Sequence, residues 1–453
     1  MTSKPRLFGT DGIRGVAGRY PLDRETVGRI GHALGIFLNN TAPSRPAQVV
    51  LGEDTRESSP WISRALAGGL RASGAEVDYA GVITTPGVAY LARQHGFAAG
   101  VMVSASHNPY RDNGIKVISH EGMKLAEALE VEIEAILSGV SPLDHKLLDT
   151  ELKPDPQMLR DFVEFLVRLV TAGDDLTKYR VVVDCSHGAA SRVIPEVMRR
   201  LEIETRVINA QPNGRNINLR CGSLHPEAMA AETKSWGADL GVAFDGDADR
   251  AIFATHGGRL TDGDHILYAA ATHFDRRGAL KGRAVVGTLM TNLGLEVALA
   301  HHGIALKRTA VGDKFVLEEM LRSGINLGGE PSGHIIFSDI APAGDGIITL
   351  LQVLQLMAET GESLESLVRP LKQFPQIILN VPVTEKLPLD SIPSVAHAIS
   401  MSREEFGDQG RVVVRYSGTE PLARVMVEAE DSGAVRRHAE RIATAIASAL
   451  GPK

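Results

Sequence analysis

Short apolar runs alternate with longer amphipathic stretches along this 453-residue chain, and glycines stand at many of the boundaries between them. Runs rich in β-branched residues predict strands, whereas apolar residues at helical spacing predict helices. Strands that alternate with helices are typical of parallel sheets, because two parallel strands need a long connection between them. The pattern therefore predicts an α/β protein.

The same succession of elements occurs three times. The predicted first strands are 48–51, 180–184 and 283–287, the helices are 60–73, 190–201 and 293–302, and the second strands are 75–80, 204–209 and 304–310. In each unit a further helical stretch precedes a third strand, which ends in a polar loop. Units of this kind resemble one another for physical reasons alone, which leaves chance similarity open. Because ligands bind beyond the carboxyl ends of such strands, three chemically rich loops suggest three related domains that face one cleft.

A polar, proline-containing link at about 138–156 and a change of pattern after residue 374 indicate the domain boundaries. The last part of the chain contains three strands, a helix and a closing amphipathic helix at 432–450. We expect domains at 1–153, 154–255, 256–371 and 372–453. The predicted fold is three related mixed α/β domains plus a C-terminal α+β domain around a central cleft.

Composition excludes several classes of function. The net charge of −7 gives no general attraction to nucleic acid or to acidic membranes, so we expect neither as a partner. No run approaches the length of a membrane helix, and the N-terminus lacks the apolar core of a signal peptide, so we expect a cytoplasmic protein. Two cysteines are too few for a disulfide framework, and Cys185 is expected to be a small buried residue.

The loop Ser104–Pro109 follows an apolar run and ends in Asn-Pro, a pair that favours a turn. It presents Ser106 and His107 at the end of a strand, where chemistry is commonly placed. Taken alone, the same residues fit an ordinary polar turn in which Ser106 and Asn108 bond to nearby backbone.

A second loop places Asp245, Asp247 and Asp249 at alternate positions after an apolar strand. An EF-hand does not fit, because Arg250 stands where the sharp-turn glycine belongs and His256 stands where the bidentate glutamate belongs. A solvated acidic turn is the remaining alternative. Three carboxylates after a buried strand would repel one another without a cation, so we favour a divalent metal site, with Mg²⁺ as the expected ion.

The third loop contains Glu330, Ser332 and His334, a carboxylate, a hydroxyl and an imidazole that suit the neighbouring hydroxyls of a sugar. Taken alone, His334 fits a buried core histidine equally well.

Near the C-terminus, Ser417-Gly418-Thr419 lies between Arg415 and Arg424. Hydroxyls, flexible backbone and guanidinium groups together suit a phosphate, although the same tripeptide is a common hairpin turn. The glycine-rich segment 8–15 carries Arg14, which could also reach a phosphate. That segment is neither a Walker loop nor a dinucleotide fingerprint.

Five motifs stand in one order along the chain: FGTDGIRG from Phe8, SASHNP from Ser104 with DNGIK ending at Lys116, DGDADR from Asp245, GEPSGH from Gly329 and RYSGTEP from Arg415. Together they closely resemble the α-D-phosphohexomutase superfamily over essentially the whole chain. The sequences SGTEPLAR, VGTLMTNLGLE, AVGDKFVLEEM and CGSLHPE are most similar to the phosphoglucosamine mutase subgroup, whereas phosphomannomutase/phosphoglucomutase enzymes have an SNTxP-type loop.

The resemblance implies an enzyme that interconverts glucosamine 6-phosphate and glucosamine 1-phosphate, a step toward UDP-N-acetylglucosamine and cell-wall precursors. It implies a hexose 1,6-bisphosphate as primer and intermediate, and it fits a homodimer through the first domain. Ser106 would carry the phosphoryl group and, with Asp245, Asp247 and Asp249, hold one Mg²⁺. The other implied catalytic residues are Arg14, His107, Lys116 and Arg250. The implied substrate-binding residues are Glu330, Ser332, His334, Arg415, Ser417, Gly418, Thr419 and Arg424.

Two residues depart from the subgroup pattern. Pro331 stands where phosphoglucosamine mutases usually carry Gln or Asn, and Tyr416 stands where Lys is common. Both positions lie where the sugar is read, so a phosphomannomutase/phosphoglucomutase remains an alternative. A non-catalytic phosphosugar-binding protein is a second alternative. It would be expected to have lost Ser106 or one of the three aspartates, and none is missing.

Overall fold

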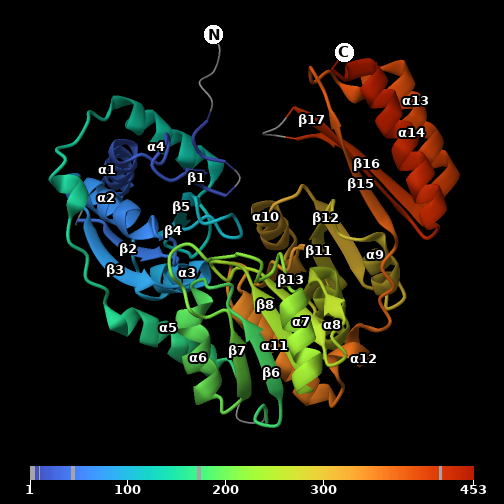
Figure 1. Cartoon of the computed structure of the whole chain (residues 1–453), viewed down its shortest axis with the longest axis horizontal. Coiled ribbons are helices and arrows are strands. Elements are labelled where there is room, and N and C mark those ends of the chain that lie inside the picture. The colour runs from blue at the N-terminus through green and yellow to red at the C-terminus, as the bar shows by residue number, and fades with distance from the viewer. Residues whose placement is uncertain (1–5, 10, 42–45, 171–174, 418–420, 453) are drawn as a thin grey trace.

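The computed structural model describes residues 6–9, 11–41, 46–170, 175–417 and 421–452. Four sheets follow one another along the chain, with five, five, four and three strands. In Figure 1 the first sheet (blue) and the last sheet (red) lie on opposite sides of the molecule, and the second and third connect them below. The predicted fold class of three α/β units and a different C-terminal unit is confirmed.

The first sheet has the strand order β1-β5-β4-β2-β3. Its strands are β1 (Ile13–Val16), β2 (Gln48–Glu53), β3 (Glu76–Val82), β4 (Ala99–Val103) and β5 (Asp112–Ser119), and its helices are α1 (Arg24–Thr41), α2 (Ser59–Ala72), α3 (Thr85–Gln94) and α4 (Glu127–Gly139). The strand β4 is buried along its whole length, which explains its uninterrupted apolar sequence.

The second sheet has the order β10-β9-β8-β6-β7. Its strands are β6 (Arg180–Asp184), β7 (Glu204–Ile208), β8 (Leu240–Phe244), β9 (Ala251–Thr255) and β10 (Leu260–Thr261), and its helices are α5 (Pro156–Arg168), α6 (Ala190–Arg200) and α7 (Glu227–Trp236). The helix α5 follows the predicted link, and it begins there because Asp155 caps it and Pro156 occupies its first turn.

The third sheet has the order β12-β11-β13-β14. Its strands are β11 (Ala284–Thr288), β12 (Ala305–Thr309), β13 (Leu327–Gly329) and β14 (Ile335–Phe337), and its helices are α8 (Gly263–Arg276), α9 (Leu293–Ala300), α10 (Asp313–Ser323), α11 (Gly346–Thr360) and α12 (Leu364–Val368). The carboxylate of Asp345 caps α11 by accepting hydrogen bonds from two backbone N–H groups.

The predicted repeat is present in the pairing of the strands. In each of the three units the first strand pairs in parallel with the second and the third, and the third pairs antiparallel with a fourth. The fourth strand was not part of the sequence prediction. It returns the chain through a short hairpin, and this hairpin contains the polar loop in every unit.

The C-terminal unit is an antiparallel sheet with the order β15-β17-β16, covered on one face by two helices (Figure 1). The strands are β15 (Gln376–Pro382), β16 (Gly410–Tyr416) and β17 (Leu422–Ala429), and the helices are α13 (Pro393–Phe406) and α14 (Ser432–Leu450). The buried face of α14 carries apolar residues at helical spacing, as the sequence predicts.

The hydrophobic clusters show which units are packed together through a shared core. One continuous cluster joins α3, α5, the second sheet and the helices of the third unit, with Phe162 of α5 fully buried at its centre. The C-terminal unit has a separate cluster built around Val435, Ile442 and Ile446. Among the described residues, no helix combines the length and apolar character needed to cross a membrane.

Candidate active site

The loops SASHNP, DGDADR and GEPSGH occupy the same connection in their three units, between the third and fourth strands. Each loop contains a residue with a left-handed backbone, namely Ser106 (φ 52°), Ala248 (φ 58°) and Gly333 (φ 90°). Residues from all three loops line one cleft of about 800 Å³, together with Arg415, Ser417 and Arg424 of the C-terminal unit. The predicted convergence of the loops on a single cleft is therefore observed.

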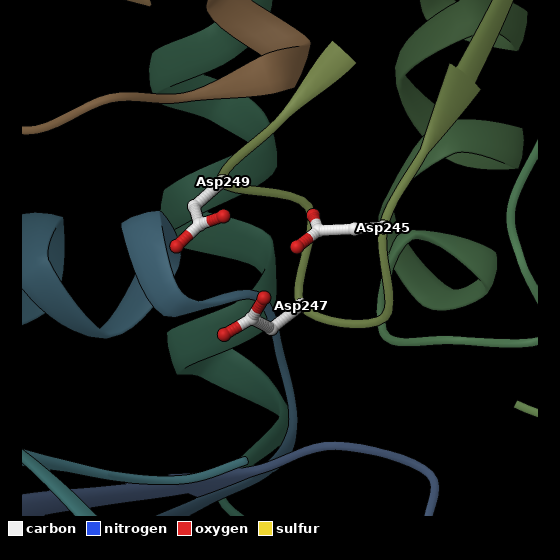
Figure 2. A group of neighbouring side chains, drawn as sticks. All are labelled: Asp245, Asp247 and Asp249. Atoms are coloured by element: carbon white, nitrogen blue, oxygen red, sulfur yellow. The ribbon is translucent and has the colours of Figure 1, made fainter. Parts of the chain in front are cut away.

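Figure 2 shows the three aspartates of the second loop gathered on one side of the β8–β9 turn. All three are buried, and each offers a carboxylate oxygen within 4.8 Å of those of the other two. Burial, followed by repulsion from Asp249 and Asp247, raises the pKa of Asp245 well above its usual range. Within the described part of the chain, Asp247 Oδ1 and Asp249 Oδ1 are buried without a hydrogen-bond partner. Orphaned carboxylate oxygens around a common point fit a hard divalent cation.

Ser106 is directed at this carboxylate cluster. Its Oγ donates a hydrogen bond to Asp245 Oδ2 at 2.5 Å and lies 3.3 Å from His107 Nδ1. The serine is 1% exposed, yet the next residue, His107, lines the cleft. The hydroxyl therefore lies against Asp245, on a residue adjacent in sequence to one that lines the cleft.

His107 contacts a cation rather than an acid. Arg250 Nη1 lies 3.1 Å from His107 Nδ1. Burial, with help from the charges of Arg250 and Arg14, lowers the pKa of His107 to about 4. The imidazole is therefore neutral near pH 7 and can accept a hydrogen bond from Arg250. Arg14 lines the same side of the cleft and pairs with Asp11.

Lys116 of β5 lies beneath the aspartates. Its Nζ is 2.8 Å from Asp247, 3.3 Å from Asp249 and 3.4 Å from Asp11. Burial opposes the charge of Lys116, but the three carboxylates outweigh it and raise the pKa of the lysine well above its usual range. Conversely, although burial disfavours its ionisation, Lys116 is the strongest influence that holds the pKa of Asp249 well below the usual range.

The third loop supplies uncharged and anionic groups at the cleft. Glu330 Oε1 accepts a hydrogen bond from the backbone N–H of Gly312 at 3.1 Å. Ser332 Oγ is buried and has no hydrogen-bond partner among the described residues. His334 lies 3.9 Å from Asp249 and 3.5 Å from Asp313, so it is held between two carboxylates and is not a core histidine in an apolar setting.

The hairpin between β16 and β17 presents cations to the opposite side of the cleft. Arg415 and Arg424 are directly paired across the two strands, and both line the cleft with Ser417. Burial, and then the charge of Arg424, lowers the pKa of Arg415. A bound anion would relieve this repulsion. The predicted residues Gly418 and Thr419 lie outside the described residues.

Sequence reasoning missed several charged residues of the site. Lys124 pairs with both Asp11 and Asp313, and this chain of charges connects the first unit to the start of α10 in the third. Arg56 is 1% exposed and contacts the backbone of the Ser106 loop. Asp11 and Asp313 belong to the motifs FGTDGIRG and AVGDKFVLEEM, but the motifs alone do not single out these two aspartates. Nothing in the sequence separates Arg56 from an ordinary surface arginine.

Comparison with known protein families gives four matches in the same order as the units. The matching families are described as phosphoglucomutase/phosphomannomutase alpha/beta/alpha domain I (residues 5–142), domain II (160–258), domain III (262–374) and the C-terminal domain (378–445). Together they match most of the chain.

Two similar relatives are phosphoglucosamine mutases. The chain is 51% identical to the enzyme of Koribacter versatilis, over 98% of this chain and 97% of the relative. It is 46% identical to that of Solibacter usitatus, over 98% of this chain and 99% of the relative.

Solved structures share the fold at lower sequence identity. A putative phosphomannomutase from Thermus thermophilus is similar with a TM-score of 0.78 and 24% identity, covering 98% of this chain and 99% of the other. The N-acetylphosphoglucosamine mutase of Aspergillus fumigatus, solved with GlcNAc-6P and magnesium, is similar with a TM-score of 0.65 and 18% identity, covering 99% and 97%. At these identities the likeness concerns the fold.

Proposed function

This chain belongs to the phosphoglucomutase/phosphomannomutase family, and we propose that it interconverts glucosamine 6-phosphate and glucosamine 1-phosphate through a phosphoserine. One observation carries the proposal: Ser106 Oγ donates a hydrogen bond to Asp245, one of three buried aspartates. These residues adjoin a cleft that is also lined by arginine and lysine side chains. Full-length relatives named phosphoglucosamine mutase support the amino sugar as substrate.

The three aspartates and Ser106 would hold one Mg²⁺, and the orphaned oxygens of Asp247 and Asp249 support that assignment. When bound, the ion would supply positive charge to the oxygens of the phosphoryl group. The remaining work falls to the chain itself. Lys116 and Arg250 would neutralise charge on the group in transfer, and neutral His107 would keep Arg250 directed at it.

The phosphoryl group of Ser106 would pass to the 1-hydroxyl of glucosamine 6-phosphate: the P–O bond to Ser106 Oγ breaks, a P–O bond to the sugar forms, and the proton of the sugar hydroxyl passes to the released Ser106 oxygen. The resulting 1,6-bisphosphate would turn within the cleft and return its 6-phosphoryl group to Ser106. Glu330, Ser332 and His334 would bind sugar hydroxyls. Arg415, Arg424, Ser417, Gly418 and Thr419 would hold the phosphate that is not reacting.

The domain limits 1–153, 154–255, 256–371 and 372–453 remain our proposal for the four units, although β10 (Leu260–Thr261) of the second sheet lies beyond the limit at residue 255. We also propose a cytoplasmic location and a hexose 1,6-bisphosphate as the primer that first phosphorylates Ser106. A second candidate function, a phosphomannomutase/phosphoglucomutase, is kept open by Pro331, which departs from the Gln or Asn usual in phosphoglucosamine mutases and removes a backbone N–H from the sugar loop.

The test compares kcat/KM for glucosamine 6-phosphate, glucose 1-phosphate and mannose 1-phosphate, each with Mg²⁺ and a hexose bisphosphate. We expect a clear preference for the amino sugar. A preference for glucose 1-phosphate or mannose 1-phosphate would instead support the second candidate function, a phosphomannomutase/phosphoglucomutase. If no substrate reacts even when mass spectrometry shows Ser106 to be phosphorylated, the chain is a phosphosugar-binding protein and the proposal is wrong.

A further inference from the structure

Two side chains from different units donate hydrogen bonds to the same two carbonyl groups of the Ser106 loop. Arg56, from the first unit, donates from Nη2 to the carbonyl oxygens of Ser106 and Asn108, each at 2.9 Å. Asn218, from the segment between β7 and α7 in the second unit, donates from Nδ2 to the same two oxygens at 2.9 and 3.1 Å. The loop that contains Ser106 is therefore held by hydrogen bonds from both the first and the second unit.

These hydrogen bonds support an unfavourable backbone conformation at Ser106. Ser106 adopts a left-handed conformation with φ 52°, which non-glycine residues rarely adopt without support. Its N–H donates to Ser104 Oγ at 2.9 Å, and Ser104 Oγ donates in turn to Asp54 at 2.8 Å. Both peptide groups that flank Ser106 are thus fixed, and with them the direction of its Cβ–Oγ bond toward Asp245.

The metal-binding loop is shaped to let Asn218 reach the serine loop. A Cβ added to Gly246 would lie 2.6 Å from the carbonyl oxygen of Ser106 and 3.0 Å from Asn218 Nδ2. Glycine is needed for this approach, since real Cβ atoms essentially never come within 2.6 Å of a backbone oxygen and a contact of 3.0 Å is unusually tight. Asn218 also adopts a left-handed backbone, with φ 58°, and its own N–H donates to the carbonyl of Ser186 at 2.9 Å.

From this geometry we infer that Asn218 is a positioning residue for the proposed phosphoryl transfer. It connects the second unit, which holds the aspartates, to the backbone of Ser106, so that the serine oxygen and the carboxylate cluster keep one fixed relation. Asn218 does not line the cleft. Its loss is therefore expected to affect the rate of transfer and not the binding of the sugar phosphate, which falls to Glu330 and the β16–β17 hairpin.

The experiment replaces Asn218 by glycine and uses Asn209→Gly as the matched control. Asn209 is also a left-handed asparagine of the second unit (φ 49°), but its Nδ2 donates to Asp184, away from Ser106. Glycine adopts the left-handed conformation freely, so neither change adds backbone strain. The purified, phosphorylated proteins are compared for kcat and KM with glucosamine 6-phosphate, and for single-turnover transfer from Ser106.

We expect Asn218→Gly to lower kcat and the single-turnover rate by about 10- to 100-fold with KM within about twofold, because small misplacements of reacting groups carry penalties of this size. Asn209→Gly is expected to keep kcat within about twofold, whatever its effect on thermal stability. A folded Asn218→Gly protein with the kcat of the control would overturn the inference. So would a loss of rate that came with an equal rise in KM.

If Asn218→Gly does not fold, Asn218→Asp serves in its place. Aspartate has the same shape and tolerates a left-handed backbone, but it donates no hydrogen bond to the two carbonyls. A normal kcat in Asn218→Asp would likewise reject the inference. Because the inference rests on the proposed function, the unchanged protein is measured alongside: if it transfers no phosphoryl group to any hexose phosphate, the proposed function fails, whereas an active parent with an equally active Asn218 variant refutes only the role of Asn218.

Discussion

Asp247 and Asp249 each have one oxygen bonded by Lys116 and one buried without a hydrogen-bond partner among the described residues, and Asp247 has Thr85 as an additional donor. Lys116 and Thr85 both donate to Asp247 Oδ2, at 2.8 and 2.5 Å, while its Oδ1 is buried without a hydrogen-bond partner among the described residues. One oxygen is therefore fixed by the protein and the other is left for a ligand. This division of labour is what a preorganised cation site requires, because the fixed oxygen orients the free one.

The first prediction concerns that oxygen. Asp247→Asn is expected to raise the Mg²⁺ concentration needed for half-maximal activity and to lower kcat by about 10²- to 10³-fold, since a bound ion supplies several kcal/mol of charge stabilisation. A magnesium titration of initial rates measures both quantities. Asp390→Asn, at an exposed position, serves as the control. An unchanged magnesium requirement would remove Asp247 from the metal site.

The second prediction concerns Glu53, a buried carboxyl group at the end of β2. Burial raises its pKa to about 7 from an ordinary value of 4.5, although Ser63 donates a hydrogen bond to it. The folded protein therefore binds this proton more tightly than the unfolded chain. The contribution of Glu53 to stability is full below about pH 4.5 and is lost as the pH rises toward 7.

Glu53→Gln is accordingly expected to raise the free energy of unfolding by about 2–3 kcal/mol at pH 8 and by much less at pH 5. Urea unfolding at the two pH values measures the difference. Glutamine can still accept the hydrogen bond from Ser63, so the change removes mainly the cost of a buried charge. Glu362→Gln, at an exposed position, should have no such pH dependence. Equal effects at both pH values would contradict the prediction.

At the scale of single elements, the β16–β17 hairpin carries cations into the cleft from the side opposite Ser106. Arg415 and Arg424 face the same way because they are directly opposite in an antiparallel pair. Lys386, which follows β15, supports the hairpin by donating to the carbonyl of Ser417 at 2.5 Å. A hairpin with this charge suits the end of the substrate that does not react.

The third prediction follows from that placement. Arg415→Gln is expected to raise KM by about 10- to 100-fold while Ser106 remains phosphorylated, because a lost charge-assisted hydrogen bond costs about 1.5–3 kcal/mol. Steady-state kinetics give KM, and intact-protein mass spectrometry gives the phosphorylation state. Arg436→Gln, on the exposed face of α14, is the control. An unchanged KM would show that this hairpin does not bind the phosphate that is not reacting.

Most individual elements were predictable from the sequence. The predicted strand 180–184 and helix 432–450 coincide with β6 and α14, and the family membership predicted from five motifs is confirmed by the comparisons. The fourth strand of each unit was missed. In the third unit, for example, β14 has only three residues, Ile335–Phe337, which is too short for a periodic pattern to separate it from a loop.

The candidate site was predictable where chemistry is concentrated in short motifs, such as the three aspartates. It was not predictable where it depends on long-range contacts. Asn218 lies 112 residues from Ser106 in the sequence, and Lys124 lies 189 residues from Asp313. Ser106 and Asp313 stand in the quoted motifs, but Asn218 and Lys124 do not, and the identity of each partner is set by how the sheets pack together.

At the scale of the whole molecule, the cores divide the chain into two unequal bodies. The first three units share one hydrophobic cluster, although most of the first unit's core forms a second cluster, whereas the C-terminal unit has only a cluster of its own. Their boundary contains polar contacts, such as the hydrogen bond from Arg411 to the carbonyl of Thr291 at 2.9 Å. Polar contacts of this kind allow relative motion more readily than a shared apolar core does.

The fourth prediction is that the C-terminal unit unfolds in a calorimetric transition of its own. Ile442→Ala, at a fully buried position of its core, is expected to lower the midpoint of that transition by at least about 10 °C and to leave the larger transition in place. Leu354→Ala, in the shared core, should do the reverse. A single transition that both changes shift equally would show that all four units unfold as one.

The shared strand order has a consequence for the history of such molecules. The serine, the three aspartates and the Glu330–His334 groups occupy one equivalent hairpin in three similar units, and each hairpin is anchored at both ends by strands paired within their own sheet. A duplicated unit of this design can change the sequence of its hairpin without disturbing the pairing that supports it. Selection can then change the functional residues of one hairpin at a time, while the strand arrangement that supports the hairpin stays the same in every unit.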